Sequence, residues 1–319
     1  MKKIKFLLPL IAAGLLIGCT PAAKDNSGES SGNTAITSID ESKHADTSEV
    51  PTSSTVEDKN SIEWAAAKKA MSGKEFKLTG PNGGFAKEGN VYNVNVAGDY
   101  TVEGYLEGQI NVTVDGVKLI FKDTFIQNNE HAAVNFATSG TLKIGAVKDT
   151  KNYFINPVLS SYKDAAGMYG KDGTIEYASE AGSAIYCVGS TQHGVKAKKI
   201  IFTSGGDFWF QGTNDGSGLN TNNCLSNDEA TEGYNIHCVN CKNGIKADKK
   251  IELSRGNIFL YNLVTGLKTD ENETDVDGVS TDYHITLGAG VKVTHEKVTT
   301  LIDTPREDVA GATFDPARA

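Results

Sequence analysis

Gly194-Val195-Lys196-Ala197-Lys198 is the first copy of a five-residue phrase that recurs through the second half of the chain. Each copy reads glycine, aliphatic, polar, Ala or Thr, polar, and the later copies occupy residues 218–222, 244–248, 266–270 and 278–282. The small or aliphatic residues alternate with polar ones, which is the period-two pattern of a strand with one buried face. The glycines are 24, 26, 22 and 12 residues apart, and the first three intervals are typical of a solenoid repeat.

A longer repeat supports the same interpretation. Residues 193–211 align without gaps on residues 243–261, an offset of 50, with seven of nineteen positions identical. Two coils of about 25 residues would produce this offset. On this alignment Ile201 matches Ile251 as an inward-facing residue. We expect each coil to consist of three short strands joined by tight corners.

The predicted fold class is therefore all-β, a single right-handed parallel β-helix of about nine coils. This solenoid domain is expected over residues 76–300 and is followed by a C-terminal tail, residues 301–319. Residues 61–75 contain the one convincing helical stretch, with Ser61 as a possible N-cap. We expect this short cap helix to cover the open end of the coils, because exposed strand edges invite aggregation.

The N-terminus resembles a bacterial export signal. Within residues 1–18, three lysines precede an apolar run over residues 6–17 that is too short to span a bilayer. The sequence Leu16-Ile17-Gly18-Cys19 resembles a lipobox, in which Cys19 is acylated and becomes the mature N-terminus. The alternative is a plain signal peptide with a chance cysteine. Residues 19–60 are rich in Ser, Thr and acidic residues, which predicts a disordered tether.

The charge limits the partners. The formal net charge is −9, and removing the three lysines of the signal would make it −12. Such acidity disfavours nucleic-acid binding. We expect a monomeric, exported lipoprotein that contacts the bacterial membrane through Cys19 alone, at the cell surface or the periplasmic face.

The polar positions of the phrase form outward columns in such a stack. Lys196, Lys246 and Lys268 share one column, which we interpret as a rail that binds regularly spaced sugars. The alternative is a solvated ladder of lysines paired with acids, each pair contributing little. Trp209 is expected to point outward, with Phe259 at the matching place two coils on, and an outward indole can stack on a sugar. The alternative for Trp209 is that a loop packs on it.

Acidic residues cluster late in the chain, with five acids among residues 270–277. So many carboxylates repel one another unless a cation lies among them, and hard oxygen ligands suit Ca²⁺. The predicted calcium ligands are Asp270, Asp275, Asp277 and Asp282, with Asp248 as a further candidate. A second candidate site is Asp215 with Asn214, Asn220 and Asn222, whose oxygens cluster on consecutive turns. The alternative is a solvated acidic loop.

Four cysteines remain besides Cys19, at positions 187, 224, 238 and 241. An exported protein permits disulfides, so they either form bridges or fill the core. The spacing of Cys238 and Cys241 also matches half a zinc site, but no second half completes it.

Segments of both halves resemble one known family. The resembling segments are Ala97–Gly104, Gly108–Val112, Val117–Phe121, Ala132–Val134 and the repeated phrase itself. They are similar to calcium-binding, right-handed parallel β-helix carbohydrate-binding domains that resemble pectate lyases in fold. The resemblance covers residues 85–300 and implies a carbohydrate ligand and bound calcium. The family's acid before the glycine is present only at Asp277, which leaves the number of calcium sites open.

The leading hypothesis is a surface-tethered, calcium-dependent protein that binds acidic or cellulose-like polysaccharides without cleaving them. One alternative is a calcium-dependent, pectate-type lyase, in which Lys246 or Lys268 would remove the proton next to the uronate carboxyl. Another is an adhesin or a structural surface protein. A catalytic role is therefore disfavoured, but the sequence leaves it open.

Overall fold

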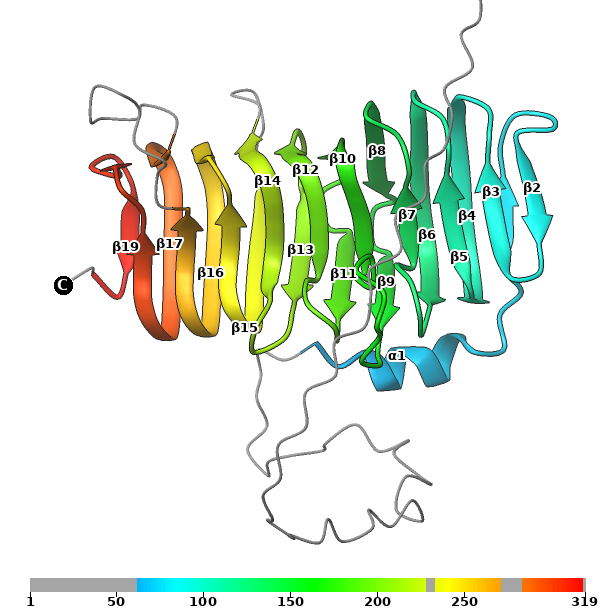
Figure 1. Ribbon diagram of the computed structural model, residues 1–319, viewed down its shortest axis with the longest axis horizontal. Helices are drawn as coiled ribbons and strands as arrows, with labels where there is room; N and C mark the ends of the chain where they lie inside the picture. Colours follow the sequence, from blue (N-terminus) through cyan, green and yellow to red (C-terminus); the bar gives the residue numbers. More distant parts are fainter. Residues whose placement is uncertain (1–61, 228–232, 271–282, 318–319) are drawn as a thin grey trace, which may run out of the picture. The chain divides into compact units, whose positions relative to one another are not determined.

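The computed structural model describes residues 62–227, 233–270 and 283–317. These residues form one all-β unit, in which α1 (Trp64–Met71) is the one helix described. Its strands lie side by side, with β2 and β3 near one end and β19 at the other (Figure 1). Every strand pairing described is parallel except β1–β4 and β2–β3.

The strands of the first half are β1 (Lys77–Thr79), β2 (Phe85–Glu88), β3 (Val91–Val94), β4 (Gly98–Glu107), β5 (Gln109–Val112), β6 (Val117–Gln127), β7 (Val134–Phe136), β8 (Thr141–Ala146) and β9 (Lys151–Asn156). Those of the second half are β10 (Met168–Tyr177), β11 (Ala184–Gly189), β12 (Val195–Phe202), β13 (Gly206–Gln211), β14 (Ser217–Asn227), β15 (Tyr234–Ala247), β16 (Lys250–Thr269), β17 (His284–Asp303), β18 (Glu307–Asp308) and β19 (Thr313–Asp315).

The prediction of an open, right-handed parallel β-helix of about nine coils, each built from three short strands, was wrong. The parallel pairings return to their starting point and close a barrel of 10 strands. Its order is β6–β8–β10–β12–β14–β16–β15–β13–β11–β9 and back to β6. Closure is possible because β6, β15 and β16 are long and continue where short strands were expected to end. Each of them therefore pairs with one strand through its first part and with another through its last part. Further strands extend the sheet beyond the barrel.

The five-residue phrase packs as its pattern predicts. Its aliphatic residues lie in register on neighbouring strands and are fully buried: Val195, Leu219, Ile245 and Leu267. The Ala or Thr two residues later is buried as well. Burial of one such aliphatic side chain contributes about 1.5–3 kcal/mol, so this column forms a large part of the core.

The first residue of the phrase is glycine because neighbouring strands approach closely there. A column of stacked glycines runs through Gly167, Gly194, Gly218, Gly244 and Gly266. A Cβ at Gly194 would lie 2.8 Å from the carbonyl oxygen of Gly218, and one at Gly244 would lie 2.7 Å from that of Gly266. Any side chain would therefore push the strands apart.

The next position in this column is taken by a different part of the chain. A Cβ at Gly266 would meet the carbonyl oxygen of Leu301, and Lys268 pairs in register with Asp303. Residues 301–303 of β17 therefore continue the stack, and were not expected to, since they were assigned to the tail. The fifth copy of the phrase, residues 278–282, lies outside the described residues.

The offset of 50 does not hold along the whole repeat. β12 passes from Ala197 to Lys199 in two residues, where β14 needs three, so the register shifts there. Ile200, not Ile201, therefore lies in the column with Ile251 and is fully buried. The prediction that Ile201 faces inward was wrong, because this irregularity moved it to the half-exposed side.

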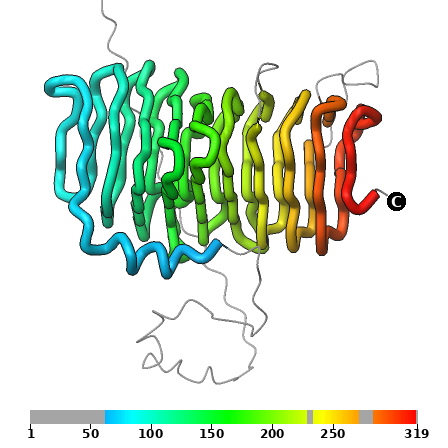
Figure 2. The backbone as a smooth tube through the Cα atoms, turned by 180° about the vertical axis from the view of Figure 1, so that it is seen from behind, coloured from blue at the N-terminus to red at the C-terminus, as the bar shows by residue number. Residues whose placement is uncertain are grey.

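The helix does not cover the end of the sheet. Ile62 and Met71 pack on residues from β6, β9, β11, β15 and β16, so the segment runs across the strands (Figure 2). Its N-cap is Glu63, without a side-chain cap bond, and Ser61 lies outside the described residues. The expectation of a cap helix over the open end was therefore wrong. The antiparallel strands β1 and β2 flank β4 and β3 at that end instead.

The glycine column makes a prediction about stability. Gly244→Ala should destabilise the fold by about 1–3 kcal/mol, because the added methyl overlaps the Gly266 carbonyl. Gly73→Ala is the control, since a Cβ there meets nothing within 4 Å. Urea unfolding of both variants measures the difference, and equal midpoints would contradict the close-approach explanation.

Candidate functional site

A polar groove of about 420 Å³ runs across the strands that carry the phrase. It is lined by polar and charged side chains from β12, β14, β15, β16 and their connections: His193, Lys196, Asp215, Ser217, Asn220, Asn222, Lys242, Asn243, Lys246, Asp248, Thr265 and Lys268. Neighbouring parallel strands are about 4.8 Å apart, so hydrogen-bond donors and acceptors repeat at this spacing from one strand to the next across the groove. The groove brings together five of the predicted site residues: Lys196, Lys246, Lys268, Asp215 and Asp248.

The floor of the groove is a row of buried polar residues just before the phrase. Ser217, Asn243 and Thr265 lie in register on β14, β15 and β16. The Asn243 amide donates to the Ser217 hydroxyl at 3.3 Å, and the Ser217 backbone N–H donates to Nδ1 of His193 at 3.1 Å. The row is therefore tied together from strand to strand.

His193 is held neutral in this groove. Burial, and then the charges of Lys196 and Lys246, lower its pKa to about 3. Since Nδ1 accepts the Ser217 N–H, the neutral ring carries its proton on Nε2. That N–H is a hydrogen-bond donor for a ligand at neutral pH.

The four lysines of the groove differ in their partners. Lys246 Nζ lies 2.8 Å from Asp270 Oδ1, and Lys268 is paired with Asp303. Among the described residues, neither Lys196 nor Lys242 has an ion-pair partner. Burial lowers the pKa of Lys196, the negative charge of Asp248 opposes this shift, and Lys171 and Lys246 add to it. The alternative interpretation, in which the lysines pair with acids, thus holds for Lys246 and Lys268. Lys196 and Lys242 remain able to bind a ligand.

Two of the predicted calcium ligands are neighbours. Asp248 and Asp270 follow the register pair Ala247 and Thr269, and burial and then the Asp270 carboxylate raise the pKa of Asp248. The ammonium of Lys246 lies between them, 3.9 Å from Asp248 Oδ1.

A complete calcium site needs about six to eight oxygen ligands. The described ranges contain no group of three or more His, Cys, Asp or Glu side chains that could hold a metal ion. Asp215 lines the groove before the start of β14, whereas Asp248 follows the end of β15, and Asp275, Asp277 and Asp282 lie outside the described residues. Among the described residues the predicted ligands thus form one close pair of carboxylates, Asp248 and Asp270, and the ammonium of Lys246 contacts both.

Trp209 belongs to a separate feature, a ladder of stacked aromatic rings on β4, β6, β9, β11, β13, β15 and β16. The ladder consists of Tyr105, Phe125, Tyr153, Tyr186, Trp209, His237 and Phe259, in register on neighbouring strands. The Trp209 and His237 rings are 3.9 Å apart and inclined by 2°, and Tyr186 lies 6.0 Å away on the other side.

Both faces of the Trp209 indole are therefore covered by rings, and the half-buried side chain also packs on the cluster that contains Ile62 and Met71. The structure does not support sugar stacking on Trp209, because a stacked sugar needs a free face. Phe259 likewise has one face on His237, at 4.4 Å. Neighbouring rings of the ladder cover the indole, where the alternative had been a loop.

The four cysteines in the sheet are unpaired and buried. Cys187, Cys224, Cys238 and Cys241 are all free. Burial raises the pKa of Cys238 well above its usual range and that of Cys241 to about 12. Such thiols remain protonated at neutral pH, so they fill the core and are poor zinc ligands.

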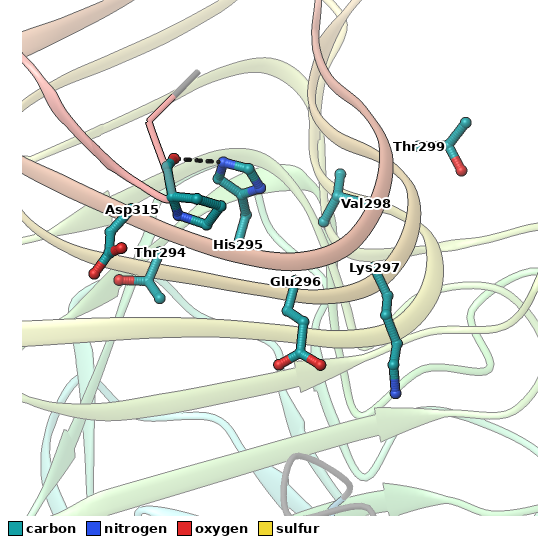
Figure 3. A pocket seen from close by; sticks show the side chains of 8 residues that line it. Thr294, His295, Glu296, Lys297, Val298, Thr299 and Asp315 are labelled. Atoms are coloured by element: carbon teal, nitrogen blue, oxygen red, sulfur yellow. Dashed lines mark hydrogen bonds between the residues drawn. The ribbon is translucent and has the colours of Figure 1, made fainter. Parts of the chain in front are cut away.

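A larger hollow of about 750 Å³ lies along β17, beside Asp315 and Pro316. Nε2 of His295 is hydrogen-bonded to the carbonyl oxygen of Pro316, whereas the side chains of Glu296 and Lys297 point the opposite way (Figure 3). The lining side chains do not converge on one point, so the polar groove is the better candidate.

Sequence reasoning found the lysines but missed the floor of the groove. His193, Ser217, Asn243 and Thr265 stand just before the phrase, with no residue type in common. Their shared signal is polarity at the position immediately before the repeated glycine. Lys242 had no repeat signal at all.

Comparison with known proteins supports a carbohydrate ligand. Residues 88–231 match a family model described as carbohydrate-binding domain-containing protein. This match includes His193 and Lys196 and ends before Lys246. Neither the curated proteins nor the solved structures gave a significant match. Within the residues that the structure describes, no helix has the length and apolar composition to cross a membrane.

The aromatic ladder predicts a pH dependence of stability. Burial lowers the pKa of His237 to about 4, although Asp207 opposes the shift. Between the unfolded pKa near 6.5 and this value, the unfolded chain binds a proton that the folded chain refuses. Stability should therefore fall as the pH drops from 7 towards 4.

The variant His237→Phe keeps a ring between Trp209 and Phe259 and removes this titration. Its melting temperature should fall less than that of the wild type between pH 7 and pH 5, as calorimetry can measure. An equal fall in both proteins would contradict the assignment to His237.

Proposed function

We propose that this protein binds an acidic or cellulose-like polysaccharide along the polar groove without cleaving it. The observation that carries the proposal is the row of donors and acceptors that four neighbouring strands present in one groove. A polysaccharide also repeats its hydroxyls at regular intervals, and each hydroxyl both donates and accepts. The family match over residues 88–231 supports the same class of ligand.

The groove also answers an electrostatic difficulty. A chain with a formal charge of −9 repels a polyuronate as a whole. Lys196 and Lys242 provide local positive charge, and neither forms an ion pair with a described acid, although Asp248 lies close enough to act on Lys196. Partial burial strengthens such an interaction, because water screens it less. An acidic sugar would therefore place its carboxylate against Lys196.

Calcium is part of the proposal. Asp248 and Asp270 offer two adjacent carboxylates, which their mutual repulsion prepares for a cation. A bound Ca²⁺ would supply positive charge that can bridge these carboxylates to an acidic sugar. To enter, the ion has to displace the Lys246 ammonium, 2.8 Å from Asp270.

We also propose that the protein is an exported lipoprotein held at the membrane through acylated Cys19. The support is the lipobox-like sequence before Cys19 and the basic, then apolar, residues that precede it. The polar stretch to residue 60 would then hold the binding unit away from the membrane.

The binding proposal predicts the effect of losing a groove lysine. Lys196→Ala should weaken retention on polygalacturonate by about tenfold, because a hydrogen bond to a charged group is lost. Lys151→Ala is the matched control, since Lys151 is exposed on β9, outside the groove. Affinity electrophoresis in gels with polygalacturonate or soluble cellulose derivatives measures the retention.

Other outcomes separate the competing functions. Release of an unsaturated product that absorbs ultraviolet light would make the protein a lyase, and Lys196, Lys246 and Lys268 would be tested as its base. No retention by any acidic or neutral glycan would favour the adhesin class and end the binding proposal.

The calcium proposal predicts a shift in thermal stability. Millimolar Ca²⁺ should raise the melting temperature above that measured in chelator, because a ligand bound to the folded state stabilises it. Asp270→Asn should reduce this shift, whereas Lys246→Met should increase it by removing the competing ammonium. Identical melting curves of the wild type with Ca²⁺ and with chelator would contradict bound calcium.

A further inference from the structure

The loop between β9 and β10 exposes apolar and aromatic side chains. Val158, Leu159 and Tyr162 are 49%, 80% and 46% exposed. They are three of the five large hydrophobic residues that are exposed in the described part of the chain. Scattered exposed apolar residues need no explanation, but a concentration on one short loop indicates a contact surface.

The Tyr162 ring is supported from one side. Its centroid lies 4.1 Å from that of the His131 ring, and the two planes are inclined by 45°. His131 is itself oriented by Asp164, because Nδ1 lies 3.0 Å from both carboxylate oxygens. One side of the tyrosine thus rests on an oriented imidazole, while nearly half of the residue remains exposed.

The loop is fixed to its neighbours by Ser160. The Ser160 hydroxyl donates to the carbonyl of Glu130 at 2.7 Å. The Ser160 backbone N–H donates to Oγ1 of Thr191 at 2.9 Å. Thr191 stands two residues before His193, whose ring lines the groove. The loop is therefore hydrogen-bonded to the segment that carries His193 to the groove.

A second connection leads to the lysine column. The loop leads directly into β10, of which Tyr169 is the second residue. Tyr169 in turn lies in register with Lys196 on the adjacent strand. A polysaccharide that leaves the groove past Lys196 therefore reaches β10, the strand that follows this loop.

We propose that Tyr162 is a second sugar-binding platform, on which a pyranose ring of the bound polysaccharide stacks just beyond the groove. The inference rests on the proposed function and adds a subsite to it. The C–H face of a pyranose is apolar and matches an aromatic ring. Among the described residues none bonds the Tyr162 hydroxyl, so it is available to a sugar hydroxyl.

A sugar fits this surface better than a protein partner does. The apolar area is confined to three side chains and is rimmed by the polar groups of Glu130 and Asp164. A stable protein interface buries about 800 Å² on each partner, which such a patch cannot supply. One or two sugar rings need far less area.

The test compares oligosaccharides of different length. Titration calorimetry would use oligogalacturonates or cello-oligosaccharides, whichever class the wild type retains, with the full chain and its Tyr162→Ala, Tyr162→Phe and Lys196→Ala variants. Tyr162→Ala should weaken the longest oligomers by about three- to tenfold, the range that an aromatic contact supplies. It should leave short oligomers that fill only the groove unchanged. Tyr162→Phe should stay close to the wild type, because it keeps the ring.

Each remaining outcome has a definite meaning. Unchanged binding of long oligomers by Tyr162→Ala, with weaker binding by Lys196→Ala, would overturn the platform and leave the groove's function intact. An equal loss for short and long oligomers would overturn it too, because Tyr162 would then act by holding the loop. A wild-type dimer that Tyr162→Ala converts to monomers, seen by light scattering, would assign the loop to a second copy. Absence of glycan binding by the wild type would end both proposals.

Discussion

The close approach of neighbouring parallel strands at the glycine column is the constraint on which the rest of the structure depends. At Gly194 and Gly244 a single added carbon would lie within 3 Å of the next strand's carbonyl oxygen. Because the strands meet there without side chains, the residues on either side of each glycine fall into register. The buried aliphatic column follows the glycines and the polar floor of the groove precedes them.

Because the strands are in register, equivalent residues form rows across the sheet. Whether a row can bind a ligand depends on which surfaces of its side chains remain free. The lysine row ends in mobile charged groups, so a residue such as Lys196 can meet a ligand although its neighbours are paired. The aromatic row is different, because stacked rings use their faces on one another. Trp209, with a ring on each side, contributes to cohesion along the ladder, whereas Tyr162 on a loop outside the register keeps part of its surface free.

The electrostatics of the groove are local and differ from those of the whole chain. The formal charge is negative, yet the groove lining contains four lysines and two aspartates. Lys246 is shared between Asp248 and Asp270, which makes it both a neutralising group and a competitor for any cation. Such an arrangement couples ligand charge, metal binding and lysine position in one small volume.

The sequence by itself determined that the phrase forms strands, that its aliphatic residues are buried and that its lysines share one column. Alternation and repeat length carry this information, because a strand's side chains alternate between faces whatever lies next to it. Only the tertiary structure decided that the pairing closes into a barrel, that β12 is one residue short and that the helix lies across the strands. These features depend on which distant segments meet.

The same division applies to the candidate site. Lys196 and Lys246 could be found from the repeat, but Lys242 could not, since it has no counterpart in the other copies. His193 shares only the polarity of the position before the glycine, and its residue type is not repeated. That Trp209 points outward was predictable from alternation; that both its faces are covered was not. Coverage is a property of the neighbouring strands, and their register was decided by the packing of the whole sheet.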